Sequence, residues 1–210
     1  MIEFFGSALV TFLVIIDPPG CAPIFASLTR GSSAAHRRAM AVRASLIAWA
    51  ILMFFGLLGR PMLEALGISL ASFRIAGGIL LFYIAVDMVF ERRTQRRENR
   101  AHSIEGTPEA EDISVFPMAI PMIAGPGSIA SAMLWVSRAE DPAHVAIVLA
   151  AITVVMILTF VTLLASEPLM RLMGEKVEAM ITRILGVILA ALAAQFVIDG
   201  LKQSFPHALA

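Results

Sequence analysis

Apolar residues occur along this chain in six long runs, and short stretches between them hold most of the charged residues. A helix needs roughly 20 apolar residues to cross a bilayer. With 59% hydrophobic and 15% charged residues among 210, the chain is also too apolar for a soluble domain. We therefore predict an all-α, polytopic membrane protein with six transmembrane helices, at about 2–28, 42–60, 68–90, 113–136, 144–166 and 179–200.

Helix-breaking residues interrupt the first and the fourth run. The first contains DPPGCAPIF, which begins at Asp17, and the fourth contains PMIAGPGSI, which begins at Pro121. Proline lacks an N–H group and disfavours helix in the residue before it, while glycine lets backbone approach a ligand closely. In hydrocarbon, unwound backbone persists only where it is buried in protein or lines a polar cavity. We expect broken helices 1 and 4, the alternative being proline kinks or re-entrant turns whose free backbone groups are satisfied by neighbouring helices.

The two halves of the chain match each other at an offset of 107 residues, which aligns Pro19-Gly20 with Pro126-Gly127. Three helices per half turn the second copy upside down relative to the first. Secondary transporters often carry such inverted repeats and bind substrate near the midplane, on discontinuous helices in corresponding positions. The expected organisation is a first repeat at 1–91, a linker at 92–112 and a second, inverted repeat at 113–210.

Basic residues concentrate in the segments after the first, third and fifth runs, above all in ERRTQRRENRAH, which begins at Glu91. The positive-inside rule places these segments in the cytoplasm and both termini on the outer, periplasmic side. We interpret the basic segment as a topology determinant rather than as a patch that binds lipid or nucleic acid. The 92–112 linker is then cytoplasmic.

The helix starts that follow the two breaks predict a binding site. The start of a helix presents unpaired N–H groups and the positive end of its dipole, which suits a carboxylate. Across the pseudo-twofold axis the two starts are expected to face each other. The candidate substrate-binding residues are Asp17, Pro19, Gly20, Cys21, Gly125, Pro126, Gly127 and Ser128.

Asp17 is an ionisable residue within a predicted span, and such residues are candidates for function because they are costly in a membrane. Three roles are open to its carboxylate. It can bind a substrate ammonium, carry a coupling proton, or cap the following half-helix by accepting an N–H.

Four further polar residues are candidates for gating or coupling. Arg74 and Arg183 occupy matched positions near the starts of the third and sixth spans, where their side chains can instead snorkel to the interface. As gating residues they would form an ion pair or clamp a carbonyl. Asp87 can also sit at the cytoplasmic interface with Arg92 and Arg93. The full set is Arg74, Asp87, Arg183 and Gln195.

The sequence holds none of the common nucleotide-binding, hydrolase or metal motifs. Cys21 is its one cysteine, and Ser128 at the matched position leaves a thiol relay without its second sulfur. We expect no catalytic residue, metal or cofactor, and no enzymatic activity.

With these motifs in this order, in a six-helix chain of this length, the sequence resembles the MarC family, also called the neutral amino acid transporter family. The resemblance covers nearly the whole chain and rests on DPPGCAPIF and PMIAGPGSI. It implies an inner-membrane protein of the lysine-exporter-like superfamily, in bacteria, with relatives that move small neutral amino acids. Many relatives carry asparagine at the position of Cys21, so the implied substrate does not carry over directly.

The resemblance and the breaks together imply a secondary transporter of a small zwitterionic amino acid, coupled to a proton or another ion. Export is one direction of transport that this hypothesis includes. A permease for another small solute or ion, and a non-transporting membrane scaffold, stay open as alternatives. A scaffold would fill the space between the two breaks with apolar side chains, whereas a carrier would leave a small polar cavity. The expected partners are the substrate and the lipid bilayer, without nucleic acid; a homo-oligomer is left open.

Overall fold

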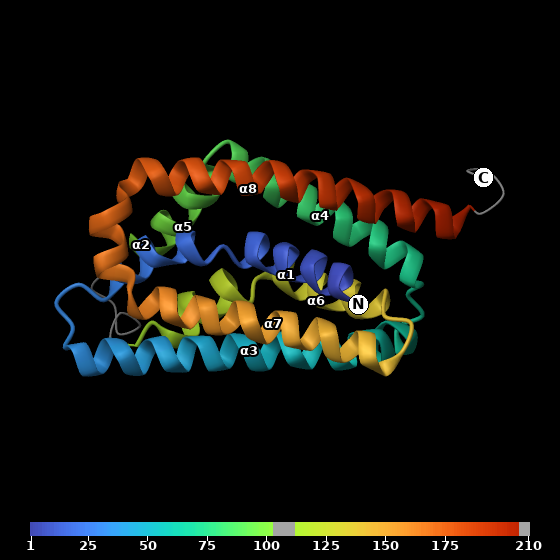
Figure 1. Ribbon diagram of the computed structural model, residues 1–210, viewed down its shortest axis with the longest axis horizontal. Helices are drawn as coiled ribbons and strands as arrows, with labels where there is room; N and C mark the ends of the chain where they lie inside the picture. The colour runs from blue at the N-terminus through green and yellow to red at the C-terminus, as the bar shows by residue number, and fades with distance from the viewer. Residues whose placement is uncertain (103–111, 206–210) are drawn as a thin grey trace.

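A computed structural model describes residues 1–102 and 112–205, and within these residues it contains helices and no strand. Figure 1 shows them as one elongated bundle, with most helices running along its long axis. In chain order the helices are α1 (Ile2–Ile16), α2 (Pro18–Leu28), α3 (Ala34–Ala65), α4 (Leu70–Val89), α5 (Arg92–His102), η2 (Ser114–Ile123), α6 (Pro126–Ser137), α7 (Pro142–Leu164) and α8 (Ser166–Ser204).

Six spans are long and apolar enough to cross a membrane. Four are unbroken: α3, α4, α7 and the Ala179–Ser204 part of α8. The other two are the broken pair α1 and α2, over Ile2–Leu28, and the pair η2 and α6, which is bent by 53° at its break. The predicted all-α polytopic fold with interrupted first and fourth spans is therefore confirmed. The inverted relation of the two halves stays a prediction.

The broken first span lies at the centre of the bundle. Its most apolar part is 72% buried within the protein, against 28–39% for the four unbroken spans. In Figure 1 it runs between a layer formed by α4 and α8 and a layer formed by α3 and α7. Phe12, Ile15 and Ile16 from α1 and Phe25 from α2 belong to the fully buried core. A break in this span therefore places free backbone groups in the interior of the protein.

The connections after α2, after α4 and between α7 and α8 lie at one end of the bundle (Figure 1). The start of α1 and the last turns of α8 lie at the opposite end. This is the alternation expected for six spans. Which end meets the cytoplasm stays a prediction.

Two features differ from the expected layout. Helix α3 begins at Ala34, and α8 begins at Ser166 directly after α7, so both extend beyond the predicted apolar runs. The predicted linker folds over Arg92–His102 as α5, which packs against α2, α4 and η2. Its continuation at 103–111 lies outside the described residues. The basic segment Arg92–His102 is thus a helix that packs on the bundle.

Candidate functional site

Asp17 forms the break between α1 and α2. Its backbone is left-handed, with φ 57° and ψ 66°, a conformation that aspartate tolerates better than most residues. Its N–H donates to the Leu13 carbonyl at 3.0 Å and ends α1. Its Oδ1 accepts the N–H of Gly20 at 3.2 Å and caps α2. Of the three roles open to Asp17, the capping role is the one whose hydrogen bond is present in the structure.

The two prolines of the break leave carbonyls of α1 without helical partners. In a continuous helix the carbonyls of Val14 and Ile15 would accept from residues 18 and 19, and both of these are proline. The Gly20 N–H, which would serve Ile16, is used by Asp17. The carbonyls of Val14, Ile15 and Ile16 thus lose their helical donors, and those of Ile15 and Ile16 receive donors from elsewhere in the structure.

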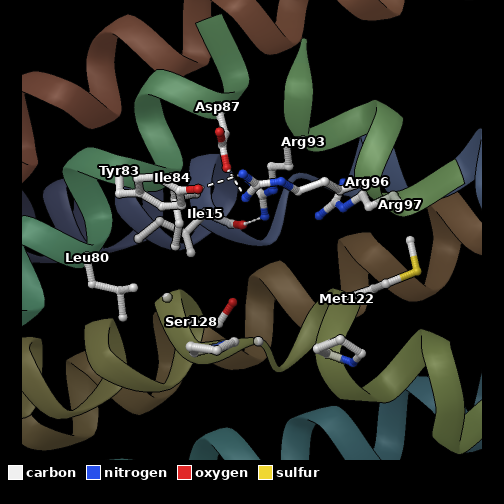
Figure 2. Close-up of a pocket in the computed structure, with 14 residues that line it drawn as sticks. Ile15, Leu80, Tyr83, Ile84, Asp87, Arg93, Arg96, Arg97, Met122 and Ser128 are labelled. Carbon is white, nitrogen blue, oxygen red and sulfur yellow. Dashed lines mark hydrogen bonds and ion pairs between the residues drawn. The ribbon is translucent and has the colours of Figure 1, made fainter. Parts of the chain in front are cut away.

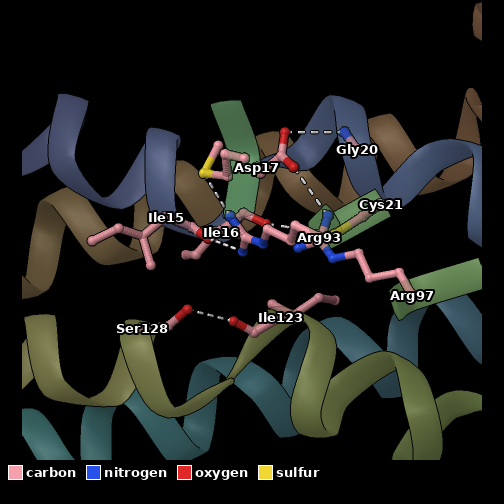
Figure 3. Close-up of polar contacts among 10 residues, drawn as sticks. Ile15, Ile16, Asp17, Gly20, Cys21, Arg93, Arg97, Ile123 and Ser128 are labelled. Carbon is pink, nitrogen blue, oxygen red and sulfur yellow. Dashed lines mark hydrogen bonds and ion pairs between the residues drawn. The ribbon is translucent and has the colours of Figure 1, made fainter. Parts of the chain in front are cut away.

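Helix α5 supplies these donors from its arginines, as Figure 3 shows. Arg93 Nη2 donates to the Ile15 carbonyl at 2.5 Å. Arg97 Nη2 donates to the Ile16 carbonyl at 3.4 Å, and its Nη1 lies 3.0 Å from Asp17 Oδ2. The Arg97 and Asp17 side chains are only 6% and 1% exposed. The first break is thus covered by a buried ion pair and two arginine–carbonyl contacts.

Gly20 leaves room for this ion pair. A Cβ atom at Gly20 would overlap the Asp17 carboxylate and lie 2.9 Å from Arg97 Nη1. The glycine in DPPG is therefore required by the close approach of the aspartate and the arginine.

The second break differs from the first because its helix start is not capped by a side chain. Helix α6 begins at Pro126, and its N-cap Gly125 supplies no side-chain acceptor. The N–H groups of Gly127 and Ser128 precede the first helical hydrogen bond of α6. The Ser128 hydroxyl donates to the Ile123 carbonyl at 2.8 Å. Within the described part of the chain these two N–H groups have no acceptor, so they are available to a ligand.

A contact recurs at the two breaks at the offset of 107 residues. Cys21 Sγ donates to the Ile16 carbonyl at 3.5 Å, as the Ser128 hydroxyl donates to the Ile123 carbonyl. Both donors lie five residues after their acceptors. The recurrence supports the predicted relation between the halves.

A cavity of about 280 Å³ lies between the second break, α4 and α5 (Figure 2). Its polar lining consists of three arginines of α5, Asp87 and Tyr83 of α4, and the start of α6. Arg96 contacts Asp87 Oδ2 and the Tyr83 hydroxyl, each at 2.5 Å. The cavity is lined by Ile15, Leu80, Tyr83, Ile84, Asp87, Arg93, Arg96, Arg97, Pro121, Met122, Gly125, Pro126, Gly127 and Ser128.

The charges at the cavity do not cancel. Arg96 pairs with Asp87 and Arg97 pairs with Asp17, which leaves the guanidinium of Arg93 with neutral partners, the Ile15 carbonyl and Met88 Sδ. Burial and the like charge of Arg97 lower the pKa of Arg93 to about 10. The side chain therefore stays charged at neutral pH, and the site carries an excess of one positive charge. It suits an anionic group.

The predicted site residues divide into two groups. Those of the second break, Gly125 to Ser128, line the cavity. Asp17, Gly20 and Cys21 are buried outside its lining, and Pro19 is also outside it. The expectation that both helix starts face one site needs correction, because the Asp17 carboxylate and Arg97 occupy the start of α2.

The four candidates for gating or coupling do not share one site. Asp87 lines the cavity and pairs with Arg96. The alternative in which Asp87 sits at the cytoplasmic interface named Arg92 and Arg93 as its neighbours instead. The other three form separate contacts: Arg183 with Glu91 at 2.5 Å, Arg74 with the Ser137 carbonyl at 3.1 Å and with Gln203 at 2.9 Å, and Gln195 with Asp199 at 2.7 Å. Arg74 thus contacts a carbonyl, which was one of the two contacts expected of a gating arginine.

The arginines of α5 are the part of the site that the sequence interpretation missed. Arg93, Arg96 and Arg97 follow the spacing i, i+3 and i+4, which places them on one face of a helix. That spacing was a signal for a cationic helix face. Among the described residues, no group of three or more histidine, cysteine, aspartate or glutamate side chains is placed to hold a metal ion.

Comparison with known proteins gives matches over the whole length. The model of a family described as MarC family integral membrane protein matches residues 2–205. A UPF0056 membrane protein of Archaeoglobus fulgidus is 36% identical over 202 residues, which cover 96% of this chain and 94% of the relative. No solved structure matches.

Two bacterial relatives also match over more than nine tenths of both chains. The UPF0056 membrane protein YvbG of Bacillus subtilis is 33% identical over 206 residues, or 98% of each chain. The UPF0056 inner membrane protein YhgN of Escherichia coli K12 is 34% identical over 196 residues, covering 93% of this chain and 95% of the relative.

Proposed function

Because the chain belongs to the MarC family of integral membrane proteins, we propose that it is a secondary transporter of small neutral amino acids in the inner, or plasma, membrane. The name of the Escherichia coli relative, an inner membrane protein, supports this location. The proposal includes export as a direction and coupling to a proton or another ion.

The cavity at the second break is the observation that carries this proposal. Its volume of about 280 Å³ is just below the range of roughly 300–1,000 Å³ typical of pockets for drug-sized ligands, so it suits a smaller molecule. It lies beside a broken span, which is where secondary transporters bind their substrates. Polar and charged groups line it, whereas a scaffold would fill this space with apolar side chains.

The lining offers complementary groups to both ends of an amino acid. A carboxylate can accept from the N–H groups of Gly127 and Ser128 and face the arginines of α5. An ammonium can approach Asp87, whose Oδ2 contacts Arg96 and whose Oδ1 forms no hydrogen bond with another described residue. Asp87 is better placed for this than Asp17, which is buried under Arg97 and lies outside the lining.

A permease for a small anion is the second candidate. The observation that favours it is the charge balance, in which the guanidinium groups of three arginines face the carboxylates of Asp17 and Asp87. An anion without an ammonium group would neutralise the excess charge of the site just as a zwitterion's carboxylate does.

Counterflow in proteoliposomes tests the proposal. Purified protein is reconstituted and loaded with unlabelled glycine, alanine, serine or leucine, and uptake of the same labelled amino acid is followed with and without a proton gradient. We expect exchange of the small neutral amino acids above the level of protein-free vesicles. Exchange of phosphate or acetate but of no amino acid would favour the anion permease, and exchange of neither would favour the scaffold.

A further inference from the structure

Arg93 differs from the other two arginines of the cavity in what it contacts. Arg96 and Arg97 each form an ion pair with a carboxylate. Arg93 donates to the Ile15 carbonyl at 2.5 Å and contacts Met88 Sδ at 3.0 Å, and it forms no ion pair within the described part of the chain. A charged guanidinium with neutral partners can gain a stronger, charge-assisted contact when an anion arrives.

The position of Arg93 favours a ligand between α5 and α6. Its guanidinium enters the cavity from α5, and the start of α6 lies on the opposite side (Figures 2 and 3). Gly127 has no side chain, and a Cβ atom there would lie 2.5 Å from Ile84 Cδ1 and 3.5 Å from Ile15 Cγ2, which belong to two other residues of the cavity lining. The start of α6 and Arg93 therefore line one cavity from two sides.

The ion pair between Arg97 and Asp17 positions Arg93. Arg93 and Arg97 are four residues apart on one face of α5, so fixing one side chain at the first break brings the other to it. Arg97 is a positioning residue in this arrangement, because its own charge is already balanced by Asp17.

We propose that Arg93 is the residue that selects for a carboxylate: its Nη1 exchanges the weak acceptor Met88 Sδ for a ligand carboxylate that also accepts from the backbone of Gly127 and Ser128, while its Nη2 keeps the Ile15 carbonyl. This inference deepens the proposed function and rests on it for the identity of the substrate as an amino acid. The carboxylate, not the ammonium, is then the group that the site requires.

Three probes of similar size separate the two ends of the ligand. Alanine carries a carboxylate and an ammonium, propionate carries only the carboxylate, and alaninamide carries only the ammonium. Their binding to the purified full chain in detergent is measured from the rise in unfolding temperature with ligand concentration. We expect binding of alanine and propionate, and at least tenfold weaker binding of alaninamide.

Variants of Arg93 provide the direct test, with Arg92→Ala as the matched control. Arg92 is the preceding residue, has the same charge, is exposed and lies over the Phe90 ring at 5.9 Å. Arg93→Ala is expected to raise the apparent Kd for propionate by about 10- to 100-fold, the range for a hydrogen bond to a charged group. Arg93→Gln keeps a donor for the Ile15 carbonyl and removes the charge, so it serves if the alanine variant does not fold.

The outcomes separate this inference from the proposed function. Wild-type affinity for propionate in Arg93→Gln, or tighter binding of alaninamide than of propionate, would overturn the role of Arg93. If the Arg93 variants exchange alanine with an unchanged KM, the role of Arg93 fails and the transporter stands. If the wild type exchanges no amino acid but binds propionate through Arg93, the carboxylate site stands and amino acid transport fails.

Discussion

Arg97 and Asp17 are 80 residues apart in the sequence, and their side chains form a buried ion pair with Nη1 3.0 Å from Oδ2. The same aspartate caps α2 through the Gly20 N–H. The Asp17 carboxylate therefore caps the helix that follows the break and also binds α5, the helix that forms in the predicted linker. This pair makes α5 part of the candidate site.

Removing one partner of this pair is expected to destabilise the protein strongly. Arg97→Gln leaves the carboxylate buried without its cation, which typically costs about 3–5 kcal/mol. Asp17→Asn removes the buried carboxylate that faces Arg97, although asparagine is nearly as good a cap as aspartate. Each variant should lower the free energy of unfolding in detergent, and the double variant should cost less than the sum of the two.

Arg92→Gln is the control for the loss of a positive charge from α5. It is expected to match the wild type, because Arg92 is exposed and forms no ion pair within the described residues. Wild-type stability of Asp17→Asn would instead mean that the cap is the whole contribution of Asp17, and additive single effects would mean that the pair is not coupled.

The breaks could be predicted from sequence because their causes are local. Pro18 and Pro19 remove N–H donors from specific carbonyls, and Gly20 permits the close approach of Asp17. The position of α5 could not be predicted from sequence, because it depends on which distant carboxylate and carbonyl groups accept hydrogen bonds from its arginines. Helical spacing indicates a cationic face, but only tertiary packing shows that Asp17 and Ile15 lie beneath it.

Gly127 is expected to be essential for the size of the cavity rather than for the fold. A Cβ atom there would lie 2.5 Å from Ile84 Cδ1, the flexible end of a side chain that can shift. Gly127→Ala should therefore fold and reduce exchange, and Gly127→Val, with a larger and β-branched side chain, should abolish it. Exchange in proteoliposomes and insertion into the membrane are measured for both.

Two variants test whether the cause is the clash with Ile84. Adding Ile84→Ala to Gly127→Ala removes the atom that the new Cβ would meet, so part of the exchange should return. Gly6→Ala is the matched control, because nothing lies within 4 Å of a Cβ atom at Gly6 in α1. Full activity of Gly127→Val would exclude the space at the start of α6 from the binding site.

The orientation of the bundle predicts opposite accessibility for two loops. Ala34 begins α3 at the end of the bundle near α5, and Glu140 lies between α6 and α7. In a Cys21→Ser background, a cysteine at Glu140 should react with an impermeant thiol reagent in intact cells. A cysteine at Ala34 should react only after the membrane is permeabilised. The reverse pattern would place the termini in the cytoplasm and invert the topology.

Asp87 is expected to recognise the ammonium of an amino acid while contributing little to carboxylate binding. Its side chain is 7% exposed and lines the cavity, and its partner Arg96 is 54% exposed, so water can solvate Arg96 after the pair is lost. Asp87→Asn preserves the shape of the side chain and removes its charge. We expect it to weaken alanine binding by about tenfold, within the range for a hydrogen bond to a charged group, and to leave propionate binding unchanged or tighter, because the site becomes more positive.

The unfolding-temperature titration with alanine and propionate measures both effects on one sample. Glu91→Gln is the control, because Glu91 pairs with Arg183 and does not line the cavity. Equal weakening of alanine and propionate by Asp87→Asn would assign Asp87 to holding α5 in place through Arg96, and not to the ammonium of the substrate.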